Sequence, residues 1–422
     1  MNNVNEKIKK YSDIKKLIKN SLDIIGIFDG EYAYKGPDCV QIDLTNNCNN
    51  NCIACWCNSP LLRDKAISPE AKKQTLDYNI VVKLINQLYA LRTAELYFSG
   101  GGEPLMHPRA MDILTYAKSK GFTCTLHTNF TLVDENTLNR LKEIKLDHLV
   151  ISLWAATPET YAKTHPNKKP DDFLRMKRML RFLNETKDCF PKVRIYNVVS
   201  RLNYREFIPM VELSTETLSE CVEFTVVDTI PERTDELLLD SGQCDELLQA
   251  CNYAKMNTQY YAKDGRFKIS NFDQFVRRIS SEHGGQAEYD RGFLDMIPCY
   301  VGWLFARIIA DGNVNSCLKS HRIPIGNLYK EDFKDIWNGR MQRQFRRCML
   351  NHKNEPGISS MIGNDPDKDI GCYKSCDDLG RNMFMHEKIS ALTKTQKILL
   401  HAAMNIKRLQ RTTFGNVQNN LF

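Results

Sequence analysis

The sequence predicts an α/β protein with a parallel sheet, followed by a smaller α+β segment. Three observations support this prediction. Six apolar strand-like runs between residues 40 and 228 alternate with amphipathic helical runs. Such alternation is typical of parallel strands joined by right-handed helical crossovers. Cysteines gather in two places, one directly after the first expected strand. From about residue 298 the alternation gives way to short strands around a hairpin signal.

We expect each strand to be followed by its own helix. An amphipathic helix over residues 6–25 precedes them, and it ends before Gly30. The expected strands are 40–44, 94–99, 123–127, 148–153, 192–200 and 221–228. The expected helices are 78–91, 108–120, 135–143, 171–187, 205–218 and 236–262. In such sheets the chemistry lies at the carboxyl ends of the strands, so the residues that follow each strand matter most.

The composition is that of a soluble globular chain. Its 422 residues suffice for two or three structural units, and 42% are hydrophobic and 26% charged. An excess of 58 Lys and Arg over 51 Asp and Glu is weak evidence for nucleic-acid binding, so we predict no nucleic-acid partner. The Lys-rich residues 1–22 and the lack of a long apolar run predict neither a signal peptide nor a membrane span. Fifteen cysteines in such a chain predict a reducing, cytoplasmic location and metal or iron–sulfur ligation.

The loop after the first strand carries Cys48, Cys52 and Cys55 in the spacing C-x3-C-x2-C. Asparagines around these cysteines tolerate turns, so the loop can bend three thiolates onto one object. Three thiolates suit a 4Fe–4S cluster with one iron left open, whereas most electron-transfer clusters use four cysteines. A zinc site with Cys57 as fourth ligand, or a disulfide, stays open at this point.

The loop after the second strand, residues 99–104, reads Ser-Gly-Gly-Gly-Glu-Pro. A glycine turn for tight packing and a phosphate-binding loop are two interpretations. A phosphate loop requires a Lys and a Ser or Thr at the helix start, and Glu103 would repel phosphate. A carboxylate beside backbone exposed by glycines suits a cationic amine instead.

These two loops together resemble the signature motifs of the radical S-adenosylmethionine (radical SAM) family. The resemblance implies a partial (β/α)6 barrel with a 4Fe–4S cluster on Cys48, Cys52 and Cys55, and S-adenosylmethionine (SAM) on the open iron. It implies reductive cleavage of SAM to a 5'-deoxyadenosyl radical, which abstracts hydrogen from a substrate. The family usually has an aromatic residue before the third cysteine, where this chain has Ala54, so Trp56 is expected to take that place.

The resemblance also assigns SAM contacts to residues at the strand ends. Backbone of the glycine loop and Glu103 would hold the SAM ammonium, and polar residues after the fourth and fifth strands would contact its ribose or carboxylate. The expected SAM-binding residues are Trp56, Gly101, Gly102, Glu103, Ser152, Arg201 and Asn203. The alternative for the strand-end residues is ordinary polarity at the rim of a sheet.

Acidic residues after the sixth strand are expected to face the substrate. Asp228, Glu232 and Asp235 are the candidate catalytic residues, on position alone. The alternative is a solvated loop.

The C-terminal cysteines resemble those of SPASM and twitch extensions, which bind auxiliary 4Fe–4S clusters. The matching features include a Gly-x4-Cys run from Gly312 to Cys317, an Ile-Gly-Asn-Leu stretch, and a closing cysteine pair. A full SPASM domain has more cysteines, so this region favours the smaller twitch form with one auxiliary cluster in a separately folded cap. The implied ligands, with Cys348 in reserve, are Cys299, Cys317, Cys372 and Cys376. A zinc ribbon is the alternative.

This interpretation divides the chain into five segments. They are a helical extension over 1–38, a radical SAM barrel over 39–235, a helical linker over 236–297, an auxiliary-cluster domain over 298–385, and a basic helical tail over 386–422.

Three functions fit these features. The first is a radical SAM oxidoreductase that oxidises or rearranges a small polar molecule such as a sugar, an aminocyclitol or a nucleotide-sugar-like compound, with flavodoxin or ferredoxin as reductant. The second is a peptide-modifying maturase. We rank it lower because such enzymes often carry a longer N-terminal recognition domain than the roughly 38 residues that precede the first strand here. The third is a non-catalytic iron–sulfur or zinc interaction protein.

Overall fold

The computed structural model describes residues 12–186, 188–257, 268–290, 296–320, 323–351, 372 and 375–419, without the side chains of Gln286 and of 412–419. Residues 6–11 and 258–262 of two expected helices lie outside this part of the chain. Residues 12–20 form the described part of the expected N-terminal helix, and a turn at Ser21 leads into α2 (Leu22–Asp29).

One sheet runs through the molecule, with the strand order β10-β9-β8-β1-β2-β3-β4-β5-β6-β7, in which the short edge strand β7 (Lys268–Ile269) pairs in parallel with β6. Strands β1 (Cys39–Asp43), β2 (Glu95–Ser99), β3 (Thr123–Thr128), β4 (His148–Ser152), β5 (Lys192–Val199) and β6 (Cys221–Val226) correspond to the six expected strands. All are parallel neighbours in chain order. The predicted α/β class with a parallel sheet is confirmed.

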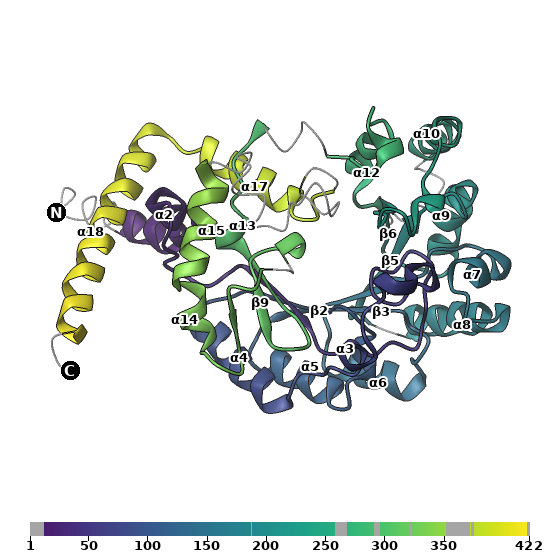
Figure 1. Cartoon of the computed structure of the whole chain (residues 1–422), viewed down its shortest axis with the longest axis horizontal. Coiled ribbons are helices and arrows are strands. Elements are labelled where there is room, and N and C mark those ends of the chain that lie inside the picture. The colour runs from purple at the N-terminus through teal and green to yellow at the C-terminus, as the bar shows by residue number, and fades with distance from the viewer. Residues whose placement is uncertain are drawn as a thin grey trace.

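Helices wrap one face of this sheet (Figure 1). They are α4 (Tyr78–Ala90), α5 (Ala110–Ser119), α6 (Glu135–Glu143), α7 (Pro158–Thr164), α8 (Pro170–Thr186), α9 (Phe207–Glu216), α10 (Ser241–Met256) and α12 (Phe272–Ile279). Apolar residues of each strand, such as Leu96, Phe98 and Leu126, are fully buried in the main core. Helix α7 was not expected, although Thr157 caps its N-terminus and Pro158 begins it, which is a readable start signal.

The opposite, inner face of the sheet carries polar and aromatic side chains. The ring of His127 lies between Tyr97 and Tyr196, with ring centroids 6.0 Å and 5.4 Å away. Burial lowers the pKa of His127 to about 4, so this imidazole is neutral at physiological pH. The inner face therefore lacks the apolar filling of a simple barrel core.

The C-terminal third continues the same sheet. Strand β8 (Phe305–Ile308) pairs in parallel with β1, and β9 (Asn313–Asn315) and β10 (Gly326–Asn327) extend it in antiparallel fashion. The expected hairpin turn has Gly312 at φ +85°, in the left-handed region that glycine adopts most easily. Around it lie α13 (Val301–Leu304), α14 (Phe333–Trp337), α15 (Arg340–Asn351) and α17 (Leu379–Ser390). The expectation of a separately folded cap is wrong in this respect, because β1 and β8 share backbone hydrogen bonds.

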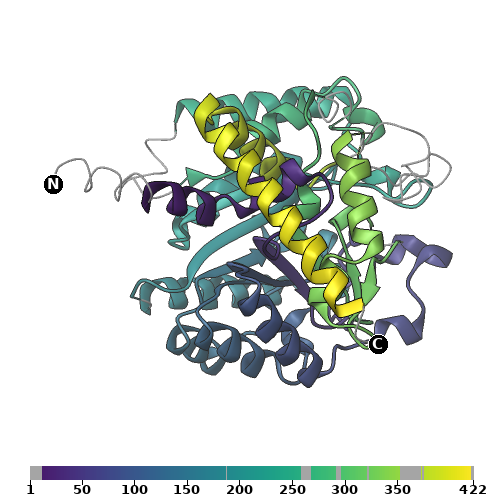
Figure 2. The same cartoon turned by 90° about the vertical axis from the view of Figure 1, so that its left-hand side faces the viewer.

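The last helix, α18 (Lys394–Asn419), crosses α2 on the outside of the molecule (Figure 2). Arg408 Nε lies 2.8 Å from the buried carboxylate of Asp29, and Lys388 Nζ of α17 lies 2.8 Å from Asp23. The basic tail is thus partly neutralised by acidic groups of α2. In the described chain, no helix combines the length and apolar character needed to cross a membrane.

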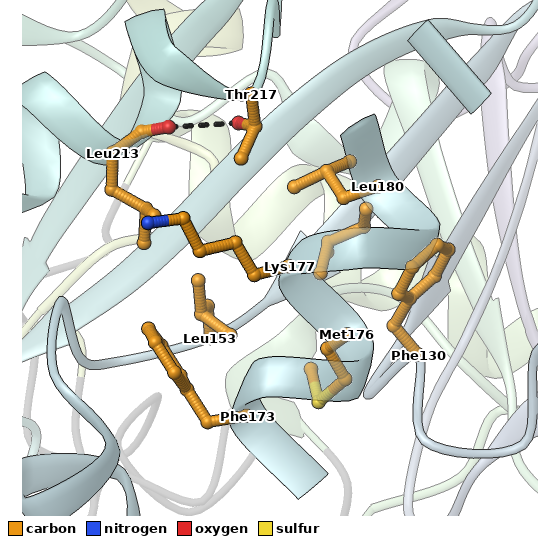
Figure 3. A pocket seen from close by; sticks show the side chains of 9 residues that line it. Phe130, Leu153, Phe173, Met176, Lys177, Leu180, Leu213 and Thr217 are labelled. Carbon is orange, nitrogen blue, oxygen red and sulfur yellow. Dashed lines mark hydrogen bonds between the residues drawn. The ribbon is translucent and has the colours of Figure 1, made fainter. Parts of the chain in front are cut away.

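A small apolar pocket lies between α8, α9 and the end of β4 (Figure 3). Phe130, Leu153, Phe173 and Met176 line it, and Thr217 at its edge donates a hydrogen bond to its own helix, at Leu213 O (2.8 Å). The pocket is on the helical side of the sheet, so it is a packing gap and we assign it no ligand.

Candidate functional site

The loop that carries Cys48, Cys52 and Cys55 leaves the carboxyl end of β1. The loop is anchored to its surroundings: Asn46 Nδ2 donates to Ala71 O (2.9 Å), and Ile53 N donates to Thr164 O (2.9 Å). A tight turn brings Cys55 N to Cys52 O (3.0 Å). The loop has no helix or strand to fix its backbone, and these hydrogen bonds hold it in one conformation instead.

Backbone amides of this loop point at its sulfur atoms. Asn50 N lies 3.5 Å from Cys48 Sγ, and the amides of Cys57 and Asn58 lie 3.4 Å and 3.3 Å from Cys55 Sγ. Burial raises the pKa of Cys48 to about 11. Burial and then the charges of Cys55 and Cys48 raise the pKa of Cys52. Three half-buried cysteines lie close enough to influence one another's charge, and N–H donors point at the sulfurs of Cys48 and Cys55. This arrangement fits an iron–sulfur cluster.

Cys57 belongs to the same loop, and burial followed by the charge of Cys55 raises its pKa to about 12. Among the described residues, no group of three or more His, Cys, Asp or Glu side chains is arranged to hold a single metal ion. The zinc alternatives therefore gain no support from this part of the chain. The thiols of a four-iron cluster, in contrast, are spread over several metal ions.

The glycine loop after β2 packs directly against the start of the cysteine loop. A Cβ atom on Gly101 would lie 2.4 Å from Asn46 Oδ1, and one on Gly102 would lie 2.1 Å from Asn47 O. Glu103 N also donates to Asn47 O (2.8 Å). The tight-packing interpretation of these glycines thus has direct support, and this packing brings the loop's backbone beside the cysteines.

Glu103 is almost fully buried at 2% exposure. Its carboxylate accepts hydrogen bonds from Thr128 Oγ1 (2.6 Å), Asn129 N (2.7 Å) and Leu105 N (3.2 Å). Burial raises the pKa of Glu103 to about 6, and these donors partly offset the effect. A carboxylate has about four acceptor sites, so one remains for a further donor. The SAM-ammonium role predicted for Glu103 stays a prediction that this geometry permits.

The other predicted SAM contacts differ in their surroundings. Ser152 ends β4 and is half-buried. Asn203 is buried and uses its amide on backbone, accepting from Ser200 N (2.8 Å) and donating to Trp154 O and Val198 O (both 2.9 Å). The Arg201 side chain is 48% exposed and lies 3.9 Å from Asp240. These roles stay predictions, and the geometry favours Ser152.

Four side chains from four segments meet where β6 ends, and we call this group the seam. Lys319 Nζ lies 2.5 Å from Asp228 Oδ2 and 3.0 Å from Ser375 Oγ, which itself donates to Asp228 Oδ2 (2.5 Å). Trp56 Nε1 donates to Asp228 O (2.8 Å), and the Lys319 ammonium lies 4.8 Å from the centre of the Trp56 ring. The second carboxylate oxygen, Asp228 Oδ1, is buried and has no hydrogen-bond partner in the described chain.

The seam joins the two cysteine regions, because Trp56 follows Cys55, Lys319 lies two residues after Cys317, and Ser375 precedes Cys376. Sequence reasoning named Asp228 but missed Lys319 and Ser375. The only feature of the sequence that pointed to Lys319 and Ser375 was their closeness to cysteines expected to be ligands. Trp56 is itself part of the seam. Its contacts there do not test whether it also lies beside the adenine of SAM, so that role stays a prediction.

The other two candidate catalytic residues lie away from the seam. Glu232 and Asp235 are exposed, and Asp235 accepts a hydrogen bond from the backbone N of Glu232 (2.6 Å). That bond closes the local turn. Their catalytic role stays a prediction without structural support.

The four C-terminal cysteines come together although they lie far apart in sequence. Burial, followed by the charge of Cys372, raises the pKa values of Cys317 and Cys376. Burial raises the pKa of Cys299 to about 12. Asn382 Nδ2 lies 3.6 Å from Cys299 Sγ, and Cys376 N donates to the buried carboxylate of Asp290 (2.6 Å). Cys348 and Cys39 pack against the same apolar group as Cys317 and Cys299, so Cys348 stays a reserve ligand.

A buried ion pair also links the barrel to β8, and sequence reasoning missed it. Arg307 Nη2 lies 2.6 Å from Asp43 Oδ2, and the Asp43 side chain is 1% exposed. Asp43 is the last residue of β1, next to the cysteine loop, so this pair fixes the loop's starting point to the C-terminal third.

Comparisons with known proteins agree with this geometry. Residues 42–213 match the model of the radical SAM superfamily, and residues 299–360 match that of the SPASM iron–sulfur cluster-binding domain. The chain is 22% identical over 320 residues to the tungsten-containing aldehyde ferredoxin oxidoreductase cofactor-modifying protein of Pyrococcus furiosus, covering 74% of this chain and 84% of that protein. It is 22% identical over 380 residues to the subtilosin biosynthesis protein AlbA of Bacillus subtilis, covering 87% and 74%.

Among solved structures, Streptococcus suis SuiB bound to S-adenosylmethionine superposes with a TM-score of 0.55 at 16% identity, covering 74% of this chain and 68% of SuiB. SuiB has also been solved bound to its precursor peptide SuiA, with a TM-score of 0.54. At this identity the likeness concerns the fold.

The chain belongs to the radical SAM superfamily and carries a SPASM-type iron–sulfur region. It is an enzyme of that superfamily, and its cofactors are 4Fe–4S clusters and S-adenosylmethionine. Which residues bind each of them, and how many auxiliary clusters are held, stay predictions.

Proposed function

We propose that this enzyme oxidises or rearranges a polar substrate held at the seam, between its two cysteine regions. The observation that carries the proposal is Asp228, whose Oδ2 is fixed by Lys319 and Ser375 while Oδ1 is buried without a partner. A buried acceptor without a donor is costly, so a substrate O–H or N–H group is its natural partner.

The first cysteine region would hold the SAM-binding cluster, which, when loaded and reduced, supplies the electron that cleaves SAM to the 5'-deoxyadenosyl radical. Residues of this chain then have separate tasks. The glycine loop and Glu103 would orient SAM, and Asp228 would orient the substrate. Cys299, Cys317, Cys372 and Cys376 would hold one auxiliary cluster. That cluster would accept an electron from the substrate, which favours two-electron oxidation.

The first candidate substrate is a small polar molecule such as a sugar, an aminocyclitol or a nucleotide-sugar-like compound. The unpartnered Asp228 Oδ1 beside the Lys319 ammonium supports this candidate, because a compact hydroxyl- or amino-bearing molecule can donate to that oxygen. The second candidate is a peptide. It is supported by the subtilosin biosynthesis protein and by SuiB, which was solved with its precursor peptide. A flavodoxin or ferredoxin would serve as reductant, in the cytoplasm.

The test uses anaerobically reconstituted full-length enzyme with SAM, a reductant and cell extract. We expect the extract to stimulate formation of 5'-deoxyadenosine and, with deuterated extract, to transfer deuterium into it. Stimulation that survives protease treatment of the extract identifies a small molecule, and loss of stimulation identifies a peptide. The D228N variant should cleave SAM without extract as wild type does, but respond weakly to extract. If the wild-type protein forms no 5'-deoxyadenosine with any reductant, the proposed function is wrong and a non-catalytic role gains support.

A further inference from the structure

Two polar groups beside the first cysteine region are buried without partners. Asn50 Nδ2 and Tyr161 Oη make no hydrogen bond within the described chain, although Asn50 is 3% exposed and Tyr161 is fully buried. Native proteins leave few such groups, and each one needs an explanation. The Asn50 side chain comes within hydrogen-bonding reach of both Cys52 and Tyr161, so the two groups lie together beside that cysteine.

Helix α7 positions Tyr161 against the cysteine loop. Thr164, near the end of the same helix, accepts the hydrogen bond from Ile53 N (2.9 Å). Just beyond the helix, the Asn51 and Asn167 side chains each accept a bond from the other residue's backbone N, at 2.9 Å and 3.1 Å. Tyr161 is one helical turn before Thr164, which places it beside Cys52. The electrostatics agree, because burial first, and then the negative charge of Cys52, raise the pKa of Tyr161.

The Tyr161 ring is held in place by its neighbours. It stacks on His165 with a centroid distance of 4.3 Å and an interplanar angle of 22°, and Phe173 lies 5.7 Å away. Burial lowers the pKa of His165 to about 4, so the stacked imidazole is neutral and places no charge near the loop. These ring contacts hold the hydroxyl in one position, close enough to Cys52 for the two groups to interact electrostatically.

Asn50 is the second of the two buried polar groups. It lies in the loop between Cys48 and Cys52, its backbone N points at Cys48 Sγ (3.5 Å), and its side chain lies near both Cys52 and Tyr161. Thr131 Oγ1 is 3.5 Å from Asn50 Oδ1, which turns the amide nitrogen away from Thr131. The Asn50 amide nitrogen donates and the Tyr161 hydroxyl can donate, whereas thiolates and cluster sulfides are acceptors.

We propose that Asn50 and Tyr161 donate hydrogen bonds to the sulfur atoms of the SAM-binding cluster at Cys52 and thereby set its reduction potential. The inference rests on the proposed function, because it requires that Cys52 holds that cluster. Reduction adds negative charge to a cluster, and donors to its sulfurs stabilise the reduced form more than the oxidised form. Both residues are positioning and tuning residues, which touch neither SAM nor substrate in this scheme.

The experiment is a redox titration of the reconstituted full chain, followed by electron paramagnetic resonance. The signal of the SAM-binding cluster is recognised by its change on addition of SAM. In Tyr161→Phe, which removes one hydroxyl and keeps the ring, we expect the ratio of reduced to oxidised cluster at the wild-type midpoint to fall three- to tenfold. A tenfold fall equals a midpoint about 59 mV lower for a one-electron couple. Tyr116→Phe is the control, because Tyr116 Oη donates a hydrogen bond to Asn86 on α4, away from the cysteine loop. The cluster in this variant should keep the wild-type midpoint potential.

Asn50→Leu provides a second variant of similar size that removes the other donor, and it should lower the midpoint in the same direction. The iron content of each variant, measured beforehand, shows that the cluster is present. A wild-type midpoint retained in both loaded variants would overturn the inference while leaving the proposed function intact. A wild-type protein that binds no SAM-sensitive cluster would refute the proposed function itself.

Discussion

The two cysteine regions are built in opposite ways. Cys48, Cys52 and Cys55 come from eight consecutive residues of one loop, whereas Cys299, Cys317, Cys372 and Cys376 come from separate segments of the C-terminal third. In the first region, three backbone donors come from its own loop, at Asn50, Cys57 and Asn58, and one side-chain donor, Asn129 Nδ2, lies 3.9 Å from Cys48 Sγ. The second depends on distant partners such as Asn382. A local motif can thus be read from spacing, while an assembled site depends on the sheet pairing of β8 with β1.

The difference has a functional counterpart. Three thiolates leave one iron of a four-iron cluster without a protein ligand, and four thiolates leave none. With the predicted ligands, the first region would bind SAM and the second would carry electrons. Removing cysteines from each region in turn tests whether SAM binding and electron transfer are divided between them in this way.

The largest effect is expected from Cys52→Ala. Two remaining thiolates cannot hold the cluster with its open iron, so formation of 5'-deoxyadenosine should fall to background. Cys124→Ala is the matched control, because Cys124 is a fully buried thiol on β3 that we assign no ligand role. SAM cleavage at the wild-type rate in Cys52→Ala, measured by chromatography of the products, would refute the first assignment.

Replacing both Cys372 and Cys376 with Ala should separate the two regions. Iron should fall from about eight to about four atoms per chain, by the arithmetic of two four-iron clusters. SAM cleavage should persist, while turnover of the substrate should fall sharply because its electron acceptor is lost. A double variant that keeps about eight iron atoms would show that these cysteines are not ligands. Four iron atoms and one zinc in the wild type would favour a zinc ribbon.

Glu103→Gln should weaken SAM binding without removing iron. Loss of a charge-assisted contact costs about 1.5–3 kcal/mol, or roughly a 10- to 150-fold higher Kd. Equilibrium binding of SAM to the reconstituted protein measures this change. An unchanged Kd would leave Glu103 with only the bonds to Thr128, Asn129 and Leu105 that the structure shows.

The same carboxyl group gives a pH dependence with a defined sign. Burial raises the pKa of Glu103 to about 6 in the folded, SAM-free protein, above the value of about 4.3 in an unfolded chain. The folded state therefore binds this proton more tightly, so the stability that the group contributes is present below about pH 4.3 and is lost as the pH rises through 6. The SAM ammonium prefers the ionised carboxylate, so the Kd of the wild type should rise below pH 6, by at most about tenfold per pH unit. In Glu103→Gln this dependence should be absent, and a flat wild-type profile between pH 7.5 and 5.5 would contradict the assignment.

The sequence predicted what depends on local pattern. Strand β3 was expected at 123–127 and helix α6 at 135–143, and both formed within a residue of those bounds, because alternation and N-capping residues such as Asp134 act over a few positions. It also predicted that Glu103 would be near the cysteine loop, because strand ends of a parallel sheet share one edge.

The sequence did not predict contacts that arise between segments. Nothing in the pattern around Arg307 indicates its pairing with Asp43, and β8 reads like the start of an independent hairpin until its register with β1 is known. Arg201 and Asn203 were chosen for their place after a strand, but hydrogen bonds to backbone occupy Asn203, and Arg201 turns toward Asp240. Side-chain direction at a strand end depends on tertiary neighbours, which spacing does not encode.

The smallest effect concerns the seam that connects the two regions. Lys319 and Asp228 form a pair whose side chains are 10% and 18% exposed. In a double-mutant cycle with Lys319→Met and Asp228→Asn, we expect a coupling of about 0.5–3 kcal/mol in the free energy of unfolding, measured with urea. Lys118 and Asp147 provide a matched pair, because their distance is also 2.5 Å and their side chains are 19% and 20% exposed. The Lys118→Met and Asp147→Asn cycle should give a similar coupling. Only the seam variants should also lose the stimulation of SAM cleavage by extract. If both pairs change stability alike and neither changes that stimulation, the seam holds the two regions together but does not contact the substrate.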